Sequence, residues 1–125
     1  MANPNIATAA NIYGKTAGIA VTTSAQAIVT NSSGSNKIFK INSLIIANVN
    51  GTSAADITVD VYKNQTTAYD LAYTITVPAD ATLVVISKDT QIYLEENDSI
   101  RVTASVNSAL EAVCSYEEIY AYFIN

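Results

Sequence analysis

Short runs of alternating apolar and polar residues recur along the chain, and no stretch repeats with the period of a helix. Residues 56–62 are the clearest case, since they read Asp-Ile-Thr-Val-Asp-Val-Tyr. Successive side chains of a strand point to opposite faces, so such a run buries one face and exposes the other. Val, Ile and Thr supply 40 of the 125 residues, and β-branched side chains favour strands. The sequence therefore predicts an all-β chain.

Turn signals separate these runs at intervals of about 8–12 residues, which is typical of sandwiches and barrels. Asn50-Gly51 is the strongest of them, and Pro78 ends a strand because proline cannot donate to a ladder. We predict an antiparallel β-sandwich of about eight strands, either jelly-roll or Ig-like. The expected strands span residues 17–22, 26–30, 37–49, 56–62, 73–77, 82–87, 91–95, 99–106 and 110–117.

The alternation also predicts which side chains face the core. On the last strand Cys114 falls in register with Leu110 and Ala112, so we expect the only thiol of the chain to be buried. Along residues 37–49 uninterrupted alternation puts one set of residues on a common face, namely Phe39, Ile41, Ser43, Ile45, Ala47 and Val49.

The two ends of the chain differ from the middle. Residues 1–16 show no period, and we expect an extended N-terminal arm there, followed by the sandwich domain over residues 17–119. Residues 120–125 form an apolar, aromatic tail, which is unfavourable to leave in water. We predict that these ends contact neighbouring subunits. The candidate interface residues are Ile12, Tyr13, Tyr116, Tyr120, Tyr122 and Phe123.

Composition argues against several classes of function. The chain has no His and one Cys, so imidazole catalysis and His or Cys metal clusters are out. The net charge is −5 and the six basic residues are scattered, which argues against nucleic-acid binding. No apolar run approaches the ~18 residues of a membrane helix. Residues 1–6 lack the charged and apolar regions of a signal peptide, so we expect synthesis in a cytosol.

The acidic residues show no catalytic or metal-binding arrangement. Only Glu95-Glu96-Asn97-Asp98 is dense, and it lacks the alternating ligand spacing and the glycine of a Ca²⁺ loop. We interpret this segment as a solvated turn. Glu117 and Glu118 are adjacent and therefore point to opposite faces of a strand. We predict no catalytic residues, no metal and no cofactor.

Three segments of the second half resemble a known family. They read Val-Pro-Ala-Asp-Ala-Thr-Leu-Val-Val (77–85), Ile-Tyr-Leu-Glu-Glu-Asn-Asp-Ser-Ile-Arg-Val-Thr-Ala-Ser (92–105) and Ser-Tyr-Glu-Glu-Ile (115–119). The pattern resembles small virion structural proteins of tailed bacteriophages. Residues 12–18, Ile-Tyr-Gly-Lys-Thr-Ala-Gly, resemble variants among phages of marine cyanobacteria. The resemblance covers residues 12–119 and implies a non-enzymatic β-sandwich of the virion, most simply a head decoration or cement protein.

The resemblance also implies partners. These are the major capsid protein or other virion proteins, together with further copies of the chain, with a trimer favoured. The expected location is the virion, assembled in the cytoplasm of a bacterial host. Two alternatives stay open, a neck, tail or fibre component and a module that binds carbohydrate or a cell surface. Convergence of Tyr62, Tyr69 and Tyr93 at one loop end would favour the second.

Overall fold

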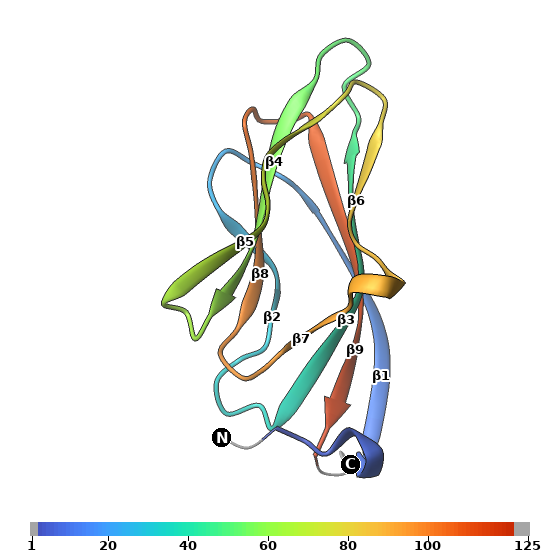
Figure 1. The fold of residues 1–125 in the computed structure, drawn as a ribbon, viewed down its shortest axis with the longest axis vertical. Helices are drawn as coiled ribbons and strands as arrows, with labels where there is room; N and C mark the ends of the chain where they lie inside the picture. Colours follow the sequence, from blue (N-terminus) through green and yellow to red (C-terminus); the bar gives the residue numbers. More distant parts are fainter. Residues whose placement is uncertain (1–2, 122–125) are drawn as a thin grey trace.

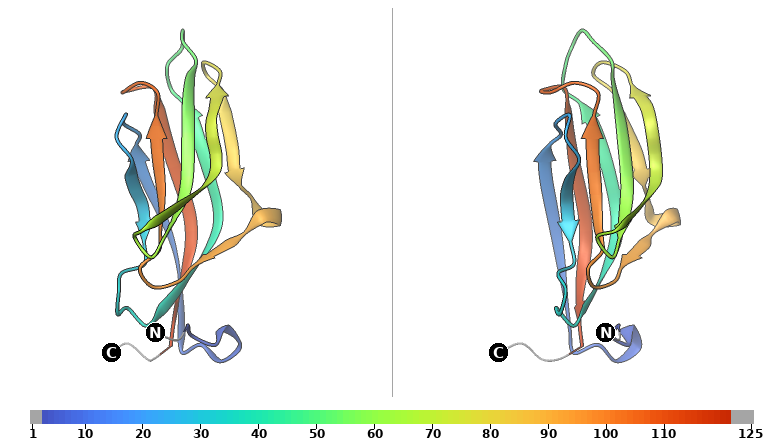
Figure 2. Two further views of the ribbon diagram at one scale, coloured as in Figure 1. Left: turned by 60° about the vertical axis from the view of Figure 1, so that its left-hand side comes forward. Right: turned by 90° about the vertical axis from the view of Figure 1, so that its left-hand side faces the viewer.

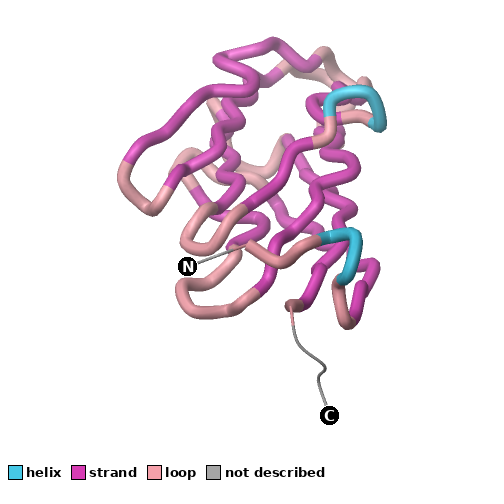
Figure 3. Tube along the Cα trace, turned by 60° about the horizontal axis from the view of Figure 1, so that its bottom comes forward, coloured by secondary structure: helices cyan, strands magenta, loops and turns pink. Residues whose placement is uncertain are grey.

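The computed structural model describes residues 3–121, and this part of the chain forms nine β-strands and two short 3-10 helices (Figure 1). The strands are β1 (Asn11–Ala20), β2 (Gln26–Thr30), β3 (Lys37–Asn48), β4 (Ala55–Lys63), β5 (Thr67–Val77), β6 (Thr82–Ile86), β7 (Ile92–Leu94), β8 (Ser99–Ala104) and β9 (Leu110–Tyr120). The helical turns, η1 (Ile6–Thr8) and η2 (Lys88–Thr90), both lie at the periphery (Figure 3). Neither of these turns is long enough to cross a membrane, and no other helix occurs within residues 3–121.

The strands form two antiparallel sheets packed face to face, which confirms the predicted β-sandwich (Figures 1 and 2). Sheet 1 has the order β1-β9-β3-β6, with β7 pairing further along β3, and sheet 2 has the order β2-β8-β4-β5. The pairs are nested, since the first strand pairs with the last, β2 with β8, β3 with β6 and β7, and β4 with β5. This nesting is the jelly roll. An Ig-like sandwich would instead keep the first two strands in one sheet.

Apolar side chains from both inner faces fill the space between the sheets. Leu110, Ala112 and Cys114 of β9 point into it, as the alternation predicts. Burial removes water from the thiol and raises the pKa of Cys114 to about 12. The largest fully buried side chains are Ile41, Leu44, Ile46, Ile57, Ile86, Leu94, Ile100, Leu110, Val21, Val59, Val77 and Val102.

A β-bulge in β3 overturns the predicted face of that strand. Ile41 lies opposite Tyr116 and Ser43 lies opposite Ser115, so Asn42 is an extra residue with no partner on β9. The extra residue shifts the alternation by one position. Beyond it Leu44 and Ile46 are buried, at 0% exposure, whereas Ile45 and Ala47 are only partly buried. The prediction that Ile45 and Ala47 face the core is therefore wrong.

The first strand begins at Asn11, not at residue 17, so Asn11–Thr16 belongs to the sandwich where the sequence predicted an extended arm. All of β1 pairs with β9 without a register shift, from Asn11 opposite Tyr120 to Ala20 opposite Glu111. The missing period has a simple cause, because this edge strand is almost entirely solvent-exposed and buries little on either face. Tyr120 likewise ends β9, whereas residues 122–125 of the predicted tail lie outside the described residues.

The strand predicted over residues 73–77 is longer and irregular. It begins at Thr67, and its register against β4 shifts between Ala72 and Ile75. Thr74 in this break has a positive φ of 47°, a conformation that side-chain-bearing residues adopt rarely. The break interrupts the alternation and leaves Tyr73 exposed at the edge of sheet 2.

Candidate docking surfaces

The outer face of sheet 1 carries mostly small side chains. Register places Gly18 opposite Val113, Val113 opposite Ile45 and Ile45 opposite Val84, so one row of apolar or absent side chains crosses all four strands. The neighbouring row runs through Ala20, Glu111, Ala47 and Thr82. We call these two rows the outer face.

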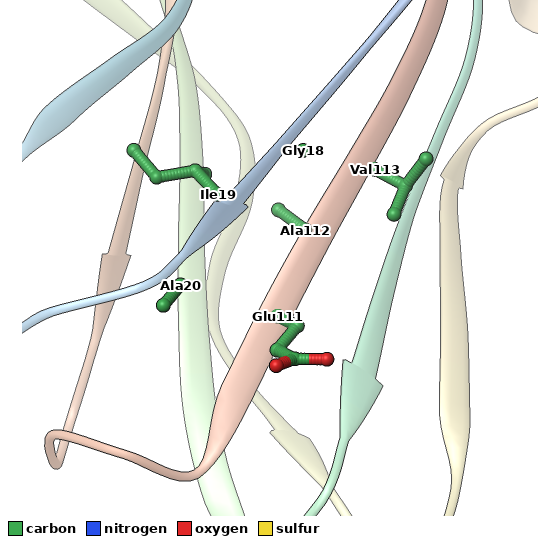
Figure 4. A pocket seen from close by; sticks show the side chains of 6 residues that line it. All are labelled: Gly18, Ile19, Ala20, Glu111, Ala112 and Val113. Carbon is green, nitrogen blue, oxygen red and sulfur yellow. The ribbon is translucent and has the colours of Figure 1, made fainter.

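The outer face has a shallow hollow at β1. Its volume is about 300 Å³, and it is lined by Gly18, Ile19, Ala20, Glu111, Ala112 and Val113. Figure 4 shows Gly18 on β1, without a side chain, and Val113 on the neighbouring strand β9, where it is the register partner of Gly18. The hollow is open and carries one carboxylate, Glu111, so it has no arrangement of groups for catalysis.

A second, more apolar hollow opens between β5 and β6, where the edges of the two sheets meet. It has a volume of about 410 Å³ and is lined by Leu71, Ala72, Tyr73, Ile75, Leu83, Val84 and Val85. Tyr73 is 67% exposed. We call this the β5–β6 groove. The sequence predictions did not include this groove. Its signal in the sequence is a shortage of charge, since Asp80 is the only charged residue between Asp70 and Lys88.

Two of the predicted interface tyrosines, Tyr13 and Tyr120, lie beside a buried carboxylate of sheet 1. Glu118 is buried and pairs with Lys15 and Lys37, each at 3.2 Å between Nζ and a carboxylate oxygen. Tyr120 donates its hydroxyl to Glu118 Oε1 at 3.0 Å. The ring of Tyr13 meets that of Tyr120 edge to face, with 5.4 Å between centroids.

These contacts keep Glu118 ionised. Burial alone would raise the pKa of Glu118, but hydrogen bonds from Lys15, Lys37 and Tyr120 outweigh burial and hold that pKa below its ordinary value. The cluster therefore fastens β1 and β3 to β9 within one chain.

The other predicted interface residues are divided between several places. Tyr116 is half-buried and stacks on Phe39, with 5.5 Å between ring centroids. Ile12 lies on the opposite face of β1 from Tyr13 and is 54% exposed. Tyr122 and Phe123 lie outside the described residues. The structure thus brings Tyr13, Tyr116 and Tyr120 onto one face, where Tyr116 and Tyr120 contact side chains of their own chain.

The acidic turn before β8 is not the solvated turn that the sequence suggested. Asp98 is only 2% exposed and accepts hydrogen bonds from Lys63 Nζ at 2.6 Å, from Asn64 N at 2.9 Å and from Glu95 N at 3.1 Å. Glu96 accepts from the backbone N–H groups of Gly34 and Asn36. Through these hydrogen bonds the two carboxylates tie three loops together, namely residues 31–36, 64–66 and 95–98. The hydrogen bond to Asp98 is the main reason that the pKa of Lys63 is raised.

Neither a metal site nor a tyrosine platform stands out. Within residues 3–121 no three His, Cys, Asp or Glu side chains group in a way that could hold a metal ion. Tyr62 and Tyr69 belong to the β4–β5 hairpin of sheet 2, whereas Tyr93 lies on β7 of sheet 1. Arg101 covers the ring of Tyr62, at 3.8 Å from its centroid, and forms a two-pronged pair with Asp60.

Comparison with known proteins finds the fold but no family. No model of a protein family matches the chain, and no curated protein matches it. Among solved structures, a chain from the acid-stable capsid of Helicobacter pylori bacteriophage KHP30 aligns with a TM-score of 0.56 at 11% identity, over 94% of each chain. A chain from Bacillus endospore appendages, which form disulfide-linked pili, aligns with a TM-score of 0.54 at 14% identity, over 98% of each chain. At these identities the likeness shows a shared fold.

Proposed function

We propose that the chain is a non-enzymatic structural protein of a phage virion, a decoration or cement protein that lays the outer face of sheet 1 on the assembled head shell. The observation that carries the proposal is the outer face itself. Its rows hold small or apolar side chains with one carboxylate, Glu111, in a chain whose net charge is −5. Depletion of charge is what distinguishes the centre of a protein interface from the remaining surface.

The jelly roll supports this role. The same fold occurs in a chain of a phage capsid, and the sequence pattern of residues 77–119 resembles virion structural proteins. A decoration protein needs a rigid body and a docking face. Repeated weak contacts on a lattice add up to firm attachment, so no single contact has to be strong. The partners we propose are the major capsid protein and further copies of the chain, with a trimer as the favoured assembly.

Binding to shells tests the proposal directly. Purified protein is mixed with heads of the encoding phage that lack it, and bound protein is measured by co-sedimentation. We expect Ala47→Lys, at the centre of the outer face, to lower the affinity about ten-fold or more, equivalent to ~1.4 kcal/mol. Val106→Lys is the matched control, because Val106 is exposed outside this face. Equal binding of both variants, each shown to be folded by its thermal melt, would refute the docking face.

The number of copies per particle separates a head protein from its alternative. A neck, tail or fibre position predicts about six or twelve copies, whereas decoration of the shell predicts hundreds, as symmetry requires. Quantitative mass spectrometry of purified particles measures this number. The carbohydrate-binding alternative receives no support from the tyrosines, since Tyr62 and Tyr93 lie on different sheets and Arg101 covers Tyr62.

A further inference from the structure

Charged residues avoid the strands at the open sides of this sandwich. The sheet orders place β1 and β2 along one side and β5 and β6 along the other (Figure 2). These four edge strands carry two charged residues, Lys15 and Asp70, and Lys15 is already paired with Glu118. The four inner strands β3, β4, β8 and β9 carry nine, namely Lys37, Lys40, Asp56, Asp60, Lys63, Arg101, Glu111, Glu117 and Glu118.

This distribution is the reverse of the usual one. A sheet edge presents unpaired backbone groups, and soluble proteins commonly place charges there to prevent pairing with another chain. An edge without charge is open to such pairing. Here both sides of the molecule share this property.

The strand directions allow copies to join side by side. Each sheet orders four strands with every neighbouring pair antiparallel, so β1 and β6 run in opposite directions, as do β2 and β5. A second copy placed beside the first in the same orientation brings its β1 next to β6 and its β2 next to β5. Both junctions are then antiparallel, so both sheets can continue across the boundary between copies.

The two sides also differ in shape. The β5–β6 side presents Tyr73, Ile75 and Val84 as exposed, bulky side chains. On the other side, β1 presents Gly14 and Gly18, and the fold of the chain requires neither glycine. Neither has a positive φ, a Cβ on Gly14 would meet no atom within 4 Å, and a Cβ on Gly18 would lie 3.8 Å from the Ala112 carbonyl oxygen.

Glycine inside a strand lowers stability relative to alanine, so its presence calls for a reason. A frequent reason is that another backbone or ligand approaches closely. On β1, a closely approaching neighbour explains both glycines.

We propose that a second copy of this chain binds the β5–β6 groove with its β1–β2 side. The contact is head to tail, because it joins two different sides of the same molecule. The bulky side chains around the groove meet the small residues of β1, and Asp70 is the only charge of the four edge strands besides the paired Lys15. Two further charges on the groove side, Lys88 and Asp89, lie in η2 beyond the end of β6. A head-to-tail contact uses two different surfaces, so it repeats until a ring closes or a filament forms. The contact shares Gly18 and Val84 with the two ends of the outer face, but it joins the sides of the sandwich and does not depend on the virion function.

Two single variants and their mixture test this contact in the purified full chain. Tyr73→Lys places a charge in the groove side, and Gly18→Lys places one on the β1 side. We expect the wild type to form assemblies larger than a dimer in sedimentation equilibrium and each variant to weaken association at least ten-fold. The decisive result is the mixture. Each variant keeps one intact side, so the two should form a one-to-one heterodimer that grows no further.

Other results would overturn the proposal. A wild type that stays monomeric at millimolar concentration excludes the contact. A two-fold contact between grooves predicts that Gly18→Lys dimerises by itself and that the mixture contains no heterodimer. Val106→Lys controls for the added charge, since Val106 is exposed outside both sides. If either variant melts early, Ile75→Lys and Thr16→Lys replace it on the same two surfaces, because both residues are exposed.

Discussion

At the scale of single residues, Glu118 shows how a buried charge can hold strands together. Its carboxylate is buried but has three partners, Lys15, Lys37 and the Tyr120 hydroxyl. Removing one partner leaves the buried carboxylate with less compensation for its lost hydration. The lysines come from β1 and β3 and the carboxylate from β9, so the cluster fixes the three strands at the end where β1 extends beyond sheet 2 (Figure 1).

The lowered pKa of Glu118 gives this cluster a defined pH dependence. A carboxylate whose folded pKa lies below its ordinary value of 4.5 adds stability that is present above that value and is lost as the pH falls through the folded pKa. We expect Glu118→Gln to lower the free energy of unfolding at pH 7 by about 1–3 kcal/mol. The difference from wild type should shrink as the pH falls below 4.5 and through the folded pKa, because the wild-type carboxylate then takes up its proton.

Urea unfolding of both proteins across a pH series measures this effect. Glu111→Gln is the matched control, since Glu111 is exposed and forms no ion pair among residues 3–121. If the Glu118→Gln loss in the free energy of unfolding does not shrink as the pH falls below 4.5, the assigned ionisation is contradicted.

Asp98 is a second buried carboxylate that holds separate segments of the chain together. It joins the turn at residues 95–98 to the end of the β4–β5 hairpin through Lys63 and the Asn64 backbone. We expect Asp98→Asn to destabilise the protein by about 1–3 kcal/mol, because the neutral amide cannot accept all three hydrogen bonds and leaves Lys63 to pair with the exposed Glu95. Asp89→Asn, at an exposed position in η2, should change the melting temperature little. Differential scanning calorimetry of the two variants makes the comparison, and equal melting temperatures would count against the role of Asp98.

At the scale of elements, the bulge at Asn42 decides which half of β3 reaches the core. Ile46 is fully buried and Ile45 lies on the outer face. We expect Ile46→Ala to cost about 2–5 kcal/mol of stability, as for other fully buried isoleucines, and Ile45→Ala to cost clearly less. Uninterrupted alternation predicts the opposite order, so chemical denaturation of the two variants tests the bulge itself.

Alternation of apolar and polar residues predicted the buried face of some strands and not of others. Alternation placed Leu110, Ala112 and Cys114 of β9 correctly, because along those residues it is not interrupted. It failed at Asn42 because an extra residue leaves no local signal, and the shift becomes visible only against β9, far away in sequence. It failed for β1 because an exposed edge strand buries too little to show a period.

The docking surfaces were only partly accessible to the same reasoning. The aromatic residues near both ends of the sequence predicted an interface that includes Tyr13, Tyr116 and Tyr120. The structure places all three on one face of sheet 1, where Tyr13 and Tyr120 lie beside Glu118 of the same chain. The β5–β6 groove was missed. Its signal was an absence of charge along two consecutive strands, and that becomes meaningful only once both strands are known to lie at sheet edges.

At the scale of the whole molecule, the charges are sorted by position. Nine lie on the four inner strands and two on the edge strands β1 and β5, and the remainder lie in turns and in η2. The jelly roll makes this sorting possible, because its nested pairing sends β1, β2, β5 and β6 to the edges.

The reactivity of the single thiol, Cys114, shows whether the two sheets separate only when the whole sandwich unfolds. Cys114 is fully buried between the sheets and burial raises its pKa to about 12, so reagents that attack the thiolate can reach it only when the sandwich opens. We expect the folded protein to resist Ellman's reagent at pH 8. The reaction rate should rise with urea in step with the loss of β-structure seen by circular dichroism.

The matched control moves the thiol by one residue. In the double variant Cys114→Ser, Ser115→Cys the thiol lies on the outer side of β9, so it should react rapidly without urea. Fast reaction of wild-type Cys114 in the absence of urea, or a rate less sensitive to urea than global unfolding, would show that the two sheets separate locally. In that case the sandwich could not serve as the rigid body that docking on a lattice requires, because flexible contacts lose the gain of simultaneous binding.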